Sequence, residues 1–304
     1  MENDPVQEGE DTAAPATQAA AAPPPIDWAV LIAEATAIQK VTVRANTFVH
    51  LYRDDSKPVE VICDDGHTYV VKSLWADVSS RPPDAEVKES RSDEEQGRRM
   101  FNDQVCGRLG AAMGASVPTV CLIEITDDLI KANPKTMGHL KPCVGHGSRK
   151  IPDVTGKVGD FAHAEKGDNR QRYNKLSVFF GWLVSGDMQF IKGTQPPHTV
   201  YSHDHGHFLP GGPMWTQASL DTYVVDPTPT PQIVNELKLK PEETAQAGEA
   251  LKMITADNIV EALAAAPDDW NVPLADRVAL ATFVHARQER LLQTISLPPN
   301  GKAP

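Results

Sequence analysis

Short runs of β-branched and aromatic residues alternate with turn residues early in the chain. Residues of these types favour β-strands. The runs lie at residues 41–43, 47–52, 59–62 and 68–72. Asp64-Asp65-Gly66 separates the last two runs, and an Asp-Gly pair at such a place is typical of a tight hairpin because both residues tolerate a positive φ. The pattern therefore predicts an antiparallel sheet.

Helical spacing follows the predicted sheet and also precedes it. Asp27 can cap a short helix before the first strand. Apolar residues at a spacing of four, from Phe101 to Met113, predict a helix that ends at Gly114. A strand is predicted next, at residues 119–125.

The second half of the chain is predominantly helical by the same criterion. The dense apolar run at residues 176–184 predicts a buried helix, and residues 199–201 predict a short strand. The last eighty residues show helical spacing up to Ile295. Residues 81–98 and 126–172 are mostly polar, so we expect loops there.

Negative charge is concentrated at the amino end. The 304 residues carry a net charge of -12, and residues 1–25 contain five acidic side chains with no lysine or arginine. This Ala/Pro-rich segment has little apolar surface to bury, so we expect a disordered leader. The acidic balance argues against nucleic acid as a partner, because binding it needs clustered basic residues that displace counterions.

The sequence contains neither a secretory signal nor a long apolar segment. The acidic N-terminus lacks the apolar core of a signal peptide, and no stretch approaches the roughly 20 apolar residues of a membrane span. The four cysteines have no CxxC spacing and indicate buried, reduced thiols. We therefore expect a cytoplasmic protein that does not bind membranes.

Four charged residues stand where an inert fold would not place them. Lys72 ends an apolar strand, Asp103 opens the next predicted helix, Asp187 ends the buried helix, and Asp204 precedes Gly206 by two residues. Phosphoryl transfer from ATP needs a strand lysine for the phosphates and an acidic helix residue that orients this lysine. It also needs one aspartate beside the acceptor hydroxyl and another, in an Asp-x-Gly turn, for Mg²⁺. The residue types occur in this order along the chain.

Longer motifs around these residues resemble the HipA-like kinases, a branch of the protein-kinase-like fold. Residues 59–72, which end in D-D-G-H-T-Y-V-V-K, resemble the family's hairpin that carries the ATP lysine. Residues 102–118 resemble its helix with the pattern N-E-x-x-x-x-x-L-x-x-x-x-G-x-x-x-P. Including further similar segments, the resemblance spans residues 38–295. Those further segments are residues 145–149, 182–187, 201–206, 267–270 and 287–290.

The resemblance implies an α+β, bilobal protein-kinase-like fold. Its N-lobe, an antiparallel sheet plus a helix, would cover residues 26–126. Its mainly helical C-lobe would cover residues 127–297, before a flexible tail at 298–304. ATP would bind between the lobes and donate its γ-phosphoryl group to a hydroxyl of a protein serine or threonine, or of a small molecule. HipA-like relatives are associated with toxin–antitoxin systems, so an antitoxin-like partner is expected by family analogy alone.

The same resemblance gives each candidate residue a role. Lys72 would contact the α- and β-phosphates of ATP, and Asp103 would pair with this lysine. Asp187 would accept the proton of the acceptor hydroxyl or orient this group. Asp204 would bind Mg²⁺ in the turn that ends at Gly206.

Four departures from the family pattern bear on activity. Asp103 replaces a glutamate and is one methylene shorter, so its ion pair needs a closer helix or a bridging water. Lys192 stands five residues after Asp187, where a metal-binding asparagine is usual, and would place a cation in the site. Gln189 can supply an amide oxygen to Mg²⁺ instead, and it joins Asp187 as a candidate catalytic residue. Met188 follows Asp187 where an arginine is common. No G-x-G-x-x-G sequence precedes Lys72, but members of this family often lack it.

The departures leave a pseudokinase as one alternative. Such a protein would bind ATP as an interaction module without turnover. Lys192 and the shorter Asp103 favour it, whereas the joint presence of Lys72, Asp187 and Asp204 favours an enzyme.

A zinc-dependent hydrolase is the other alternative. If residues 202–207 formed a strand, three histidines would project from one face and could bind Zn²⁺. Gly206 argues against this arrangement because glycine weakens a strand. The histidines concerned are His203, His205 and His207, with His50, His67, His146 and His198 as further candidate ligands.

Overall fold

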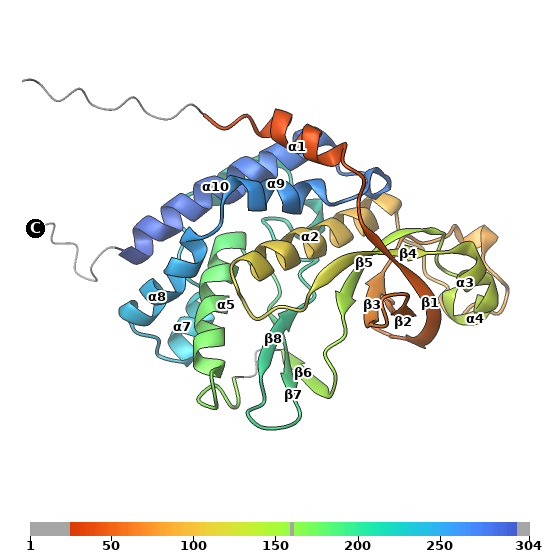
Figure 1. The fold of residues 1–304 in the computed structure, drawn as a ribbon, viewed down its shortest axis with the longest axis horizontal. Coiled ribbons are helices and arrows are strands. Elements are labelled where there is room, and N and C mark those ends of the chain that lie inside the picture. The colour runs from red at the N-terminus through yellow and green to blue at the C-terminus, as the bar shows by residue number, and fades with distance from the viewer. Residues whose placement is uncertain (1–24, 159–160, 297–304) are drawn as a thin grey trace, which may run out of the picture.

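The computed structural model describes residues 25–158 and 161–296. Residues 1–24 of the predicted leader and the predicted tail at 298–304 lie outside the described residues. The chain forms a β-barrel, a small three-stranded sheet and a mainly helical part (Figure 1). None of the described helices is long and apolar enough to cross a membrane.

A closed five-stranded barrel forms one end of the molecule (Figure 1). In spatial order its strands are β1 (Thr42–Leu51), β2 (Val59–Cys63), β3 (Thr68–Lys72), β5 (Cys143–Arg149) and β4 (Val120–Ile125). Neighbouring strands run antiparallel, and β1 pairs with β4 in parallel to close the barrel. The predicted antiparallel sheet is confirmed, and the runs at 41–43 and 47–52 join in one strand, β1.

The predicted β2–β3 hairpin is also confirmed, with a different turn. Only Gly66 adopts a positive φ, of 79°. Its N–H donates to the carbonyl of Cys63 at 3.0 Å, and the N–H of Cys63 donates to the carbonyl of His67 at 2.9 Å. Asp65 accepts hydrogen bonds from the N–H of His67 and from the hydroxyl of Tyr69. The Asp65 carboxylate therefore replaces the second positive φ as the element that stabilises this turn.

The long helix α2 (Asp93–Ala112) begins within the segment predicted as a loop at 81–98. That prediction is wrong from Asp93 onward, because a capping signal outweighs the low apolar content. Ser92 accepts a hydrogen bond from the N–H of Glu95, and three acidic residues follow it in the first turn, where the helix dipole favours them. Asp103 therefore lies in the middle of the helix and does not open it. The helix ends as predicted, just before Gly114 at φ 67°.

The expected loop at 126–172 contains two short helices and two strands. The elements are α3 (Asp127–Ala132), α4 (Pro134–Met137), β5 and β6 (Val154–Val158). The glycines of β5 suggested a loop, but they lie in the barrel because its neighbours leave no room for a side chain. A Cβ at Gly145 would lie 2.5 Å from the carbonyl oxygen of Lys72, and one at Gly147 would overlap Ile123. The barrel therefore extends beyond the N-lobe boundary predicted at residue 126.

The predicted buried helix and the helical C-terminal part are confirmed. The buried helix α5 (Asn169–Leu183) begins earlier than predicted. The small antiparallel sheet has the order β6, β7 (Gln189–Gly193) and β8 (Val200–His203). The remaining helices are α6 (Gln217–Tyr223), α7 (Pro231–Glu236), α8 (Pro241–Lys252), α9 (Ala256–Ala264) and α10 (Leu274–Ser296).

The first helix, α1 (Trp28–Thr36), packs on the last ones. Asp27 caps it as predicted, by accepting a hydrogen bond from the N–H of Val30. Its buried residues Trp28 and Ile32 join the main hydrophobic core with α9 and α10, beside which it lies in Figure 1. A second, smaller core fills the barrel. Although α1 precedes the barrel in the chain, it belongs by contact to the helical part.

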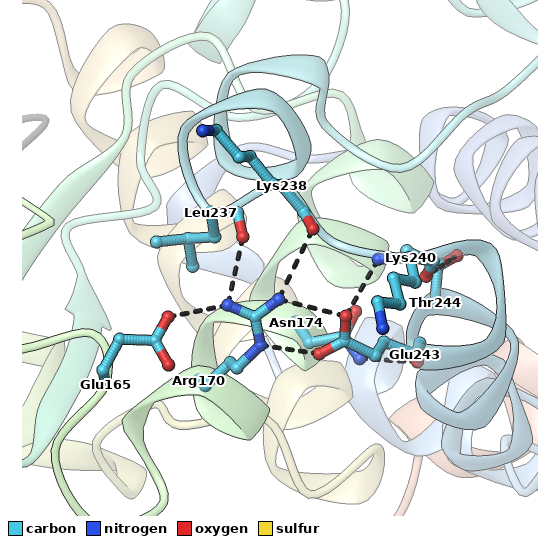
Figure 2. A network of polar contacts seen from close by, with 8 residues as sticks. All are labelled: Glu165, Arg170, Asn174, Leu237, Lys238, Lys240, Glu243 and Thr244. Atoms are coloured by element: carbon cyan, nitrogen blue, oxygen red, sulfur yellow. Dashed lines mark hydrogen bonds and ion pairs between the residues drawn. The ribbon is translucent and has the colours of Figure 1, made fainter.

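A network of polar contacts joins α5 to α8 (Figure 2). Arg170 of α5 donates to both carboxylate oxygens of Glu243, at 2.7 and 3.0 Å, and to Glu165. It also donates to the main-chain carbonyls of Leu237 and Lys238. The hydrogen bonds from Arg170 lower the pKa of Glu243 to about 2. One arginine thus fixes the start of α8 against α5, the helix that leads to Asp187.

Replacement of Gly97 by alanine is expected to destabilise the fold. A Cβ at this position of α2 would overlap the carbonyl of Trp270. Alanine normally stabilises a helix by about 1 kcal/mol relative to glycine, but overpacking against backbone costs about 1–3 kcal/mol. We expect Gly97→Ala to lower the free energy of unfolding, measured by urea denaturation.

Gly248→Ala in α8 is the matched control, because there the new Cβ overlaps only the flexible side chain of Ile295 and lies at ordinary contact distance, 3.8 Å, from Leu292. Its expected effect is neutral or stabilising. Equal effects of the two substitutions would contradict the close approach of α2 to Trp270.

Candidate active site

A cavity of about 640 Å³ is lined by residues of the barrel, α2, β7 and the segment after β8. Its volume falls in the range of sites that bind cofactors and other small molecules. All six site residues predicted from the sequence line it. They are Lys72, Asp103, Asp187, Gln189, Asp204 and Gly206.

Lys72 contacts two carboxylates inside this cavity. Its Nζ lies 2.8 Å from Oδ2 of Asp103 and 2.5 Å from Oδ1 of Asp204. Burial lowers the pKa of Lys72, but the two carboxylates outweigh this effect and raise it above its usual range. Burial likewise raises the pKa of Asp204, yet Lys72 holds it well below its usual range. Lys72 and Asp204 therefore stay charged at neutral pH.

The direct contact answers the question raised by the short side chain of Asp103. No bridging water is needed, because α2 lies close to the barrel. A Cβ on Gly107, one turn after Asp103, would lie 2.5 Å from the side chain of Val120 on β4. The absence of that Cβ lets the helix approach the sheet, which compensates for the missing methylene.

The segment after β8 forms the sharp turn expected for an Asp-x-Gly motif. Asp204 has φ 56°, so the strand ends there. Gly206 packs directly on α2, where a Cβ would lie 3.0 Å from Oδ2 of Asp103 and 3.4 Å from the carbonyl oxygen of Arg99. A larger residue at 206 would push the turn away from Asp103 and Lys72.

Asp187 lies in the loop between α5 and β7. At the end of α5, the guanidinium of Arg287 donates to the main-chain carbonyls of Gly181 and Trp182, the latter at 2.7 Å. A cation here satisfies free carbonyls and interacts favourably with the helix dipole. Nε2 of Gln189 then donates to Oδ2 of Asp187 at 2.7 Å. Arg287 and Gln189 thus fix the loop from its two ends.

Lys192 does not place its ammonium group in the cavity. Along β7 the side chains alternate between two faces. Gln189 and Ile191 are among the described residues that line the cavity, whereas Lys192 is not. Lys192 is buried on the opposite face of the strand. The prediction that Lys192 places a cation in the site is therefore wrong, although the metal-binding asparagine usual at this position is still missing.

The structure overturns the zinc-site hypothesis. The strand ends at His203, so the alternation that would align three imidazoles is broken at Asp204. His205 is buried, lies 2.9 Å from the hydroxyl of Ser202 and packs edge-on against the ring of Phe208. Within the described residues 25–158 and 161–296, no group of three or more His, Cys, Asp or Glu side chains could hold a metal ion.

Three features of the site were not predicted from the sequence. His146 of β5 lines the cavity beside Lys72, and burial lowers its pKa to about 4. The amide of Gln104, oriented by its neighbours, donates to Nδ1 of His146 and accepts from Nε of Arg108, each at 2.8 Å.

The second feature is the β1–β2 loop, which includes Asp54 and lines the cavity where kinases have a Gly-rich loop. The third feature is Asn102, which binds the segment after Gly206. The sequence had pointed to His146 only as a zinc ligand and as part of the family-like segment 145–149, and to Asn102 only as the first residue of the family-like motif 102–118.

The donor set fits a magnesium–nucleotide complex. Carboxylate and amide oxygens of Asp204, Asp187 and Gln189 line one cavity, and Mg²⁺ prefers oxygen ligands from one or two carboxylates, completed by phosphates and water. Lys72 supplies a cation for phosphate in the same place. Phosphate groups would therefore complete a metal site that protein side chains alone do not form.

Comparison with known proteins identifies the fold. No protein-family model and no curated protein matches the sequence. The crystal structure of a Helicobacter pylori proinflammatory kinase, CtkA, superposes with a TM-score of 0.51 and 10% identity, over 85% of this chain and all of that one. A Golgi casein kinase with Mn/ADP bound gives a TM-score of 0.42 and 9% identity, over 88% of this chain and 74% of that one. This chain has a bilobal α+β protein-kinase-like fold. At such low identity, the similarity to CtkA establishes the fold alone.

Lowering the pH from 7 to 5 is expected to destabilise the protein through its buried histidines. Burial lowers the pKa of His205 to about 4, and this outweighs the nearby carboxylate of Asp103. Protonation therefore favours the unfolded chain, whose histidines titrate near 6.5. The contribution of His205 to stability is complete above about pH 6.5 and falls as the pH approaches 4, by on the order of 2 kcal/mol at pH 5.

The measurement is urea denaturation of the wild type and His205→Asn at both pH values. We expect a smaller loss between pH 7 and 5 in the variant. His50→Asn, at an exposed position on β1, is the control and should lose as much as the wild type. An unchanged loss in His205→Asn would contradict a neutral buried imidazole.

Proposed function

We propose that the chain is an ATP- and Mg²⁺-dependent phosphotransferase that transfers the γ-phosphoryl group to a hydroxyl. The contact of Lys72 with both Asp103 and Asp204, in a cavity that Asp187 also lines, supports this most directly. A strand lysine, a helix carboxylate and two further aspartates are the set that phosphoryl transfer uses in kinases. The kinase-like fold supports the same reaction class by analogy.

Each side chain has a defined task in this proposal. Lys72 binds the α- and β-phosphates, and Asp103 fixes its position. Asp204 and Gln189 hold Mg²⁺, which neutralises charge on the phosphates when bound. Asp187 orients the acceptor hydroxyl and takes its proton. While the acceptor oxygen bonds to the γ-phosphorus, the bond from that phosphorus to the bridging oxygen breaks, and ADP leaves.

The motifs favour a HipA-like kinase within this class. They support a protein serine or threonine, or a small molecule with a hydroxyl, as acceptor. An antitoxin-like partner rests on family analogy alone.

A pseudokinase is the second candidate, and one observation favours it. The asparagine usual five residues after the catalytic aspartate is replaced by Lys192, which faces away from the cavity. Gln189 is then the remaining amide beside Asp187. Binding and turnover therefore need separate tests.

ATP with Mg²⁺ is expected to stabilise the wild type against heat. A ligand at 100 times its Kd adds about 2.7 kcal/mol, which raises the Tm by several degrees in a chain of this size. Lys72→Ala and Asp204→Asn should lose this shift, each relative to its own Tm without ligand. Lys141→Ala, which breaks an ion pair with Asp93 on the surface, should keep it. No shift in the wild type at millimolar ATP would contradict the nucleotide site.

Asp187→Asn is expected to abolish turnover and to keep nucleotide binding. Loss of a general base lowers rates about 10²–10⁴-fold, whereas the amide preserves the size of the side chain beside Gln189. Release of ADP from ATP, by hydrolysis or by transfer to the chain itself, measures turnover without a known acceptor.

Asp168→Asn, at the exposed start of α5, is the control and should retain the wild-type rate. Wild-type turnover in Asp187→Asn would remove Asp187 from the mechanism. Metal-dependent ATP binding by a wild type without turnover would support the pseudokinase.

A further inference from the structure

Asn102 is a fully buried residue of α2 whose side chain binds the segment that follows the Asp204 turn. Its Nδ2 donates to the main-chain carbonyls of Gly206, Phe208 and Gly212, at 3.0, 3.2 and 3.2 Å. Its Oδ1 accepts a hydrogen bond from Nε1 of Trp215 at 3.0 Å. One side chain thus forms hydrogen bonds with four different residues of the segment 206–215.

The position of Asn102 couples this segment to the ion cluster. The next residue, Asp103, contacts Lys72, and Gly206 packs against the carboxylate of Asp103. Two consecutive residues of α2 therefore hold both the phosphate lysine and the turn that carries Asp204. In a buried, water-poor environment such hydrogen bonds are strong and mutually reinforcing.

The composition of residues 206–215 is the second observation. The sequence is G-H-F-L-P-G-G-P-M-W and contains no serine, threonine or tyrosine. In many kinases the segment after the metal-binding aspartate becomes ordered when a phosphorylated hydroxyl residue pairs with arginine. Here residues 206–215 offer no hydroxyl, and the next two hydroxyl residues, Thr216 and Ser219, form the capping box of α6. A side-chain amide from α2 makes the ordering contacts instead.

We propose that Asn102 is a positioning residue that holds Asp204 in its metal-binding place without phosphorylation of the following segment. The inference rests on the proposed function, because it assigns a task at the same metal–nucleotide site. It adds that the fold itself assembles the metal–nucleotide site, so that this assembly needs no phosphorylation of residues 206–215.

The first test is the affinity of Mn²⁺ for the chain saturated with ADP, measured by titration calorimetry. Asn102→Asp keeps the shape and the acceptor for Trp215 but turns an oxygen toward three carbonyls. We expect it to weaken Mn²⁺ binding at least tenfold, while the affinity for ADP without metal changes less than twofold. A residue that only stabilised the fold would not separate these two affinities.

Asn169→Asp is the matched control. Asn169 is almost as buried and donates to the carbonyl of His163, shortly before α5, and to those of Pro197 and His198 in the β7–β8 connection. None of these three residues lines the cavity. It should lose stability and keep the Mn²⁺ affinity of the wild type. If Asn102→Asp does not fold, Trp215→Phe removes one of the four hydrogen bonds and is expected to weaken Mn²⁺ binding about threefold.

The outcomes separate the two proposals. Wild-type Mn²⁺ affinity in folded Asn102→Asp, or in Trp215→Phe when only that variant folds, would overturn the role of Asn102 and leave the proposed function intact. Absence of Mn²⁺·ADP binding by the wild type would overturn both. Treatment of the wild type with a phosphatase should leave its Mn²⁺ affinity unchanged, and a loss of affinity would overturn assembly without phosphorylation.

Discussion

A lysine cation that contacts two carboxylates in one cavity is the constraint on which the rest of the structure depends. Moving such charges out of water costs several kcal/mol per ion, and only close, well-oriented contacts offset this cost. Lys72 meets Asp103 and Asp204 at 2.8 and 2.5 Å. One positive and two negative charges leave the cluster itself with an excess of one negative charge, and Asp187 lines the same cavity. A cluster with this excess at the wall of a cavity has a ready place for a divalent cation.

The helix α2 links this ion cluster to the packing of the rest of the molecule, because it carries Asp103 and packs against both the barrel and the helical part. Its glycines allow it to lie close to its neighbours, Gly107 against β4 and Gly97 against Trp270. Because of this approach, the short side chain of Asp103 reaches Lys72 directly, and Asn102 reaches the segment after Gly206. The C-terminal helical part therefore fixes α2 from one side while the barrel fixes it from the other. Orientation of the site is a property of the packed core rather than of a mobile loop.

Local sequence signals predicted those parts of the fold that local interactions determine. The β2–β3 hairpin, the end of α2 at Gly114 and the cap of α1 follow from turn and capping residues within a few positions. The start of α2 and the strand β5 could not be recognised from composition, because a cap outweighs a polar stretch and because the glycines of β5 are explained only by neighbours in the barrel. Lys72, Asp103, Asp187 and Asp204 were found through their order along the chain. Gly206 followed from the Asp-x-Gly turn, and Gln189 from the comparison with the family pattern. Asn102 and Arg287 were missed because their partners lie about 100 residues away in sequence.

Gln189 and Lys192 show why a residue count from Asp187 misleads. An offset of five residues identifies a metal ligand only when the intervening backbone has the conformation of the family's loop. In this chain the strand β7 begins two residues after Asp187, so side-chain direction is set by the alternation of a strand. Residues at an even distance in sequence from Gln189 face the cavity, and residues at an odd distance face the core. Lys192 lies three positions after Gln189 and therefore faces the core. Lys192 in place of the usual asparagine therefore removes a metal ligand but places no charge in the cavity. The amide of Gln189 lies beside Asp187 instead.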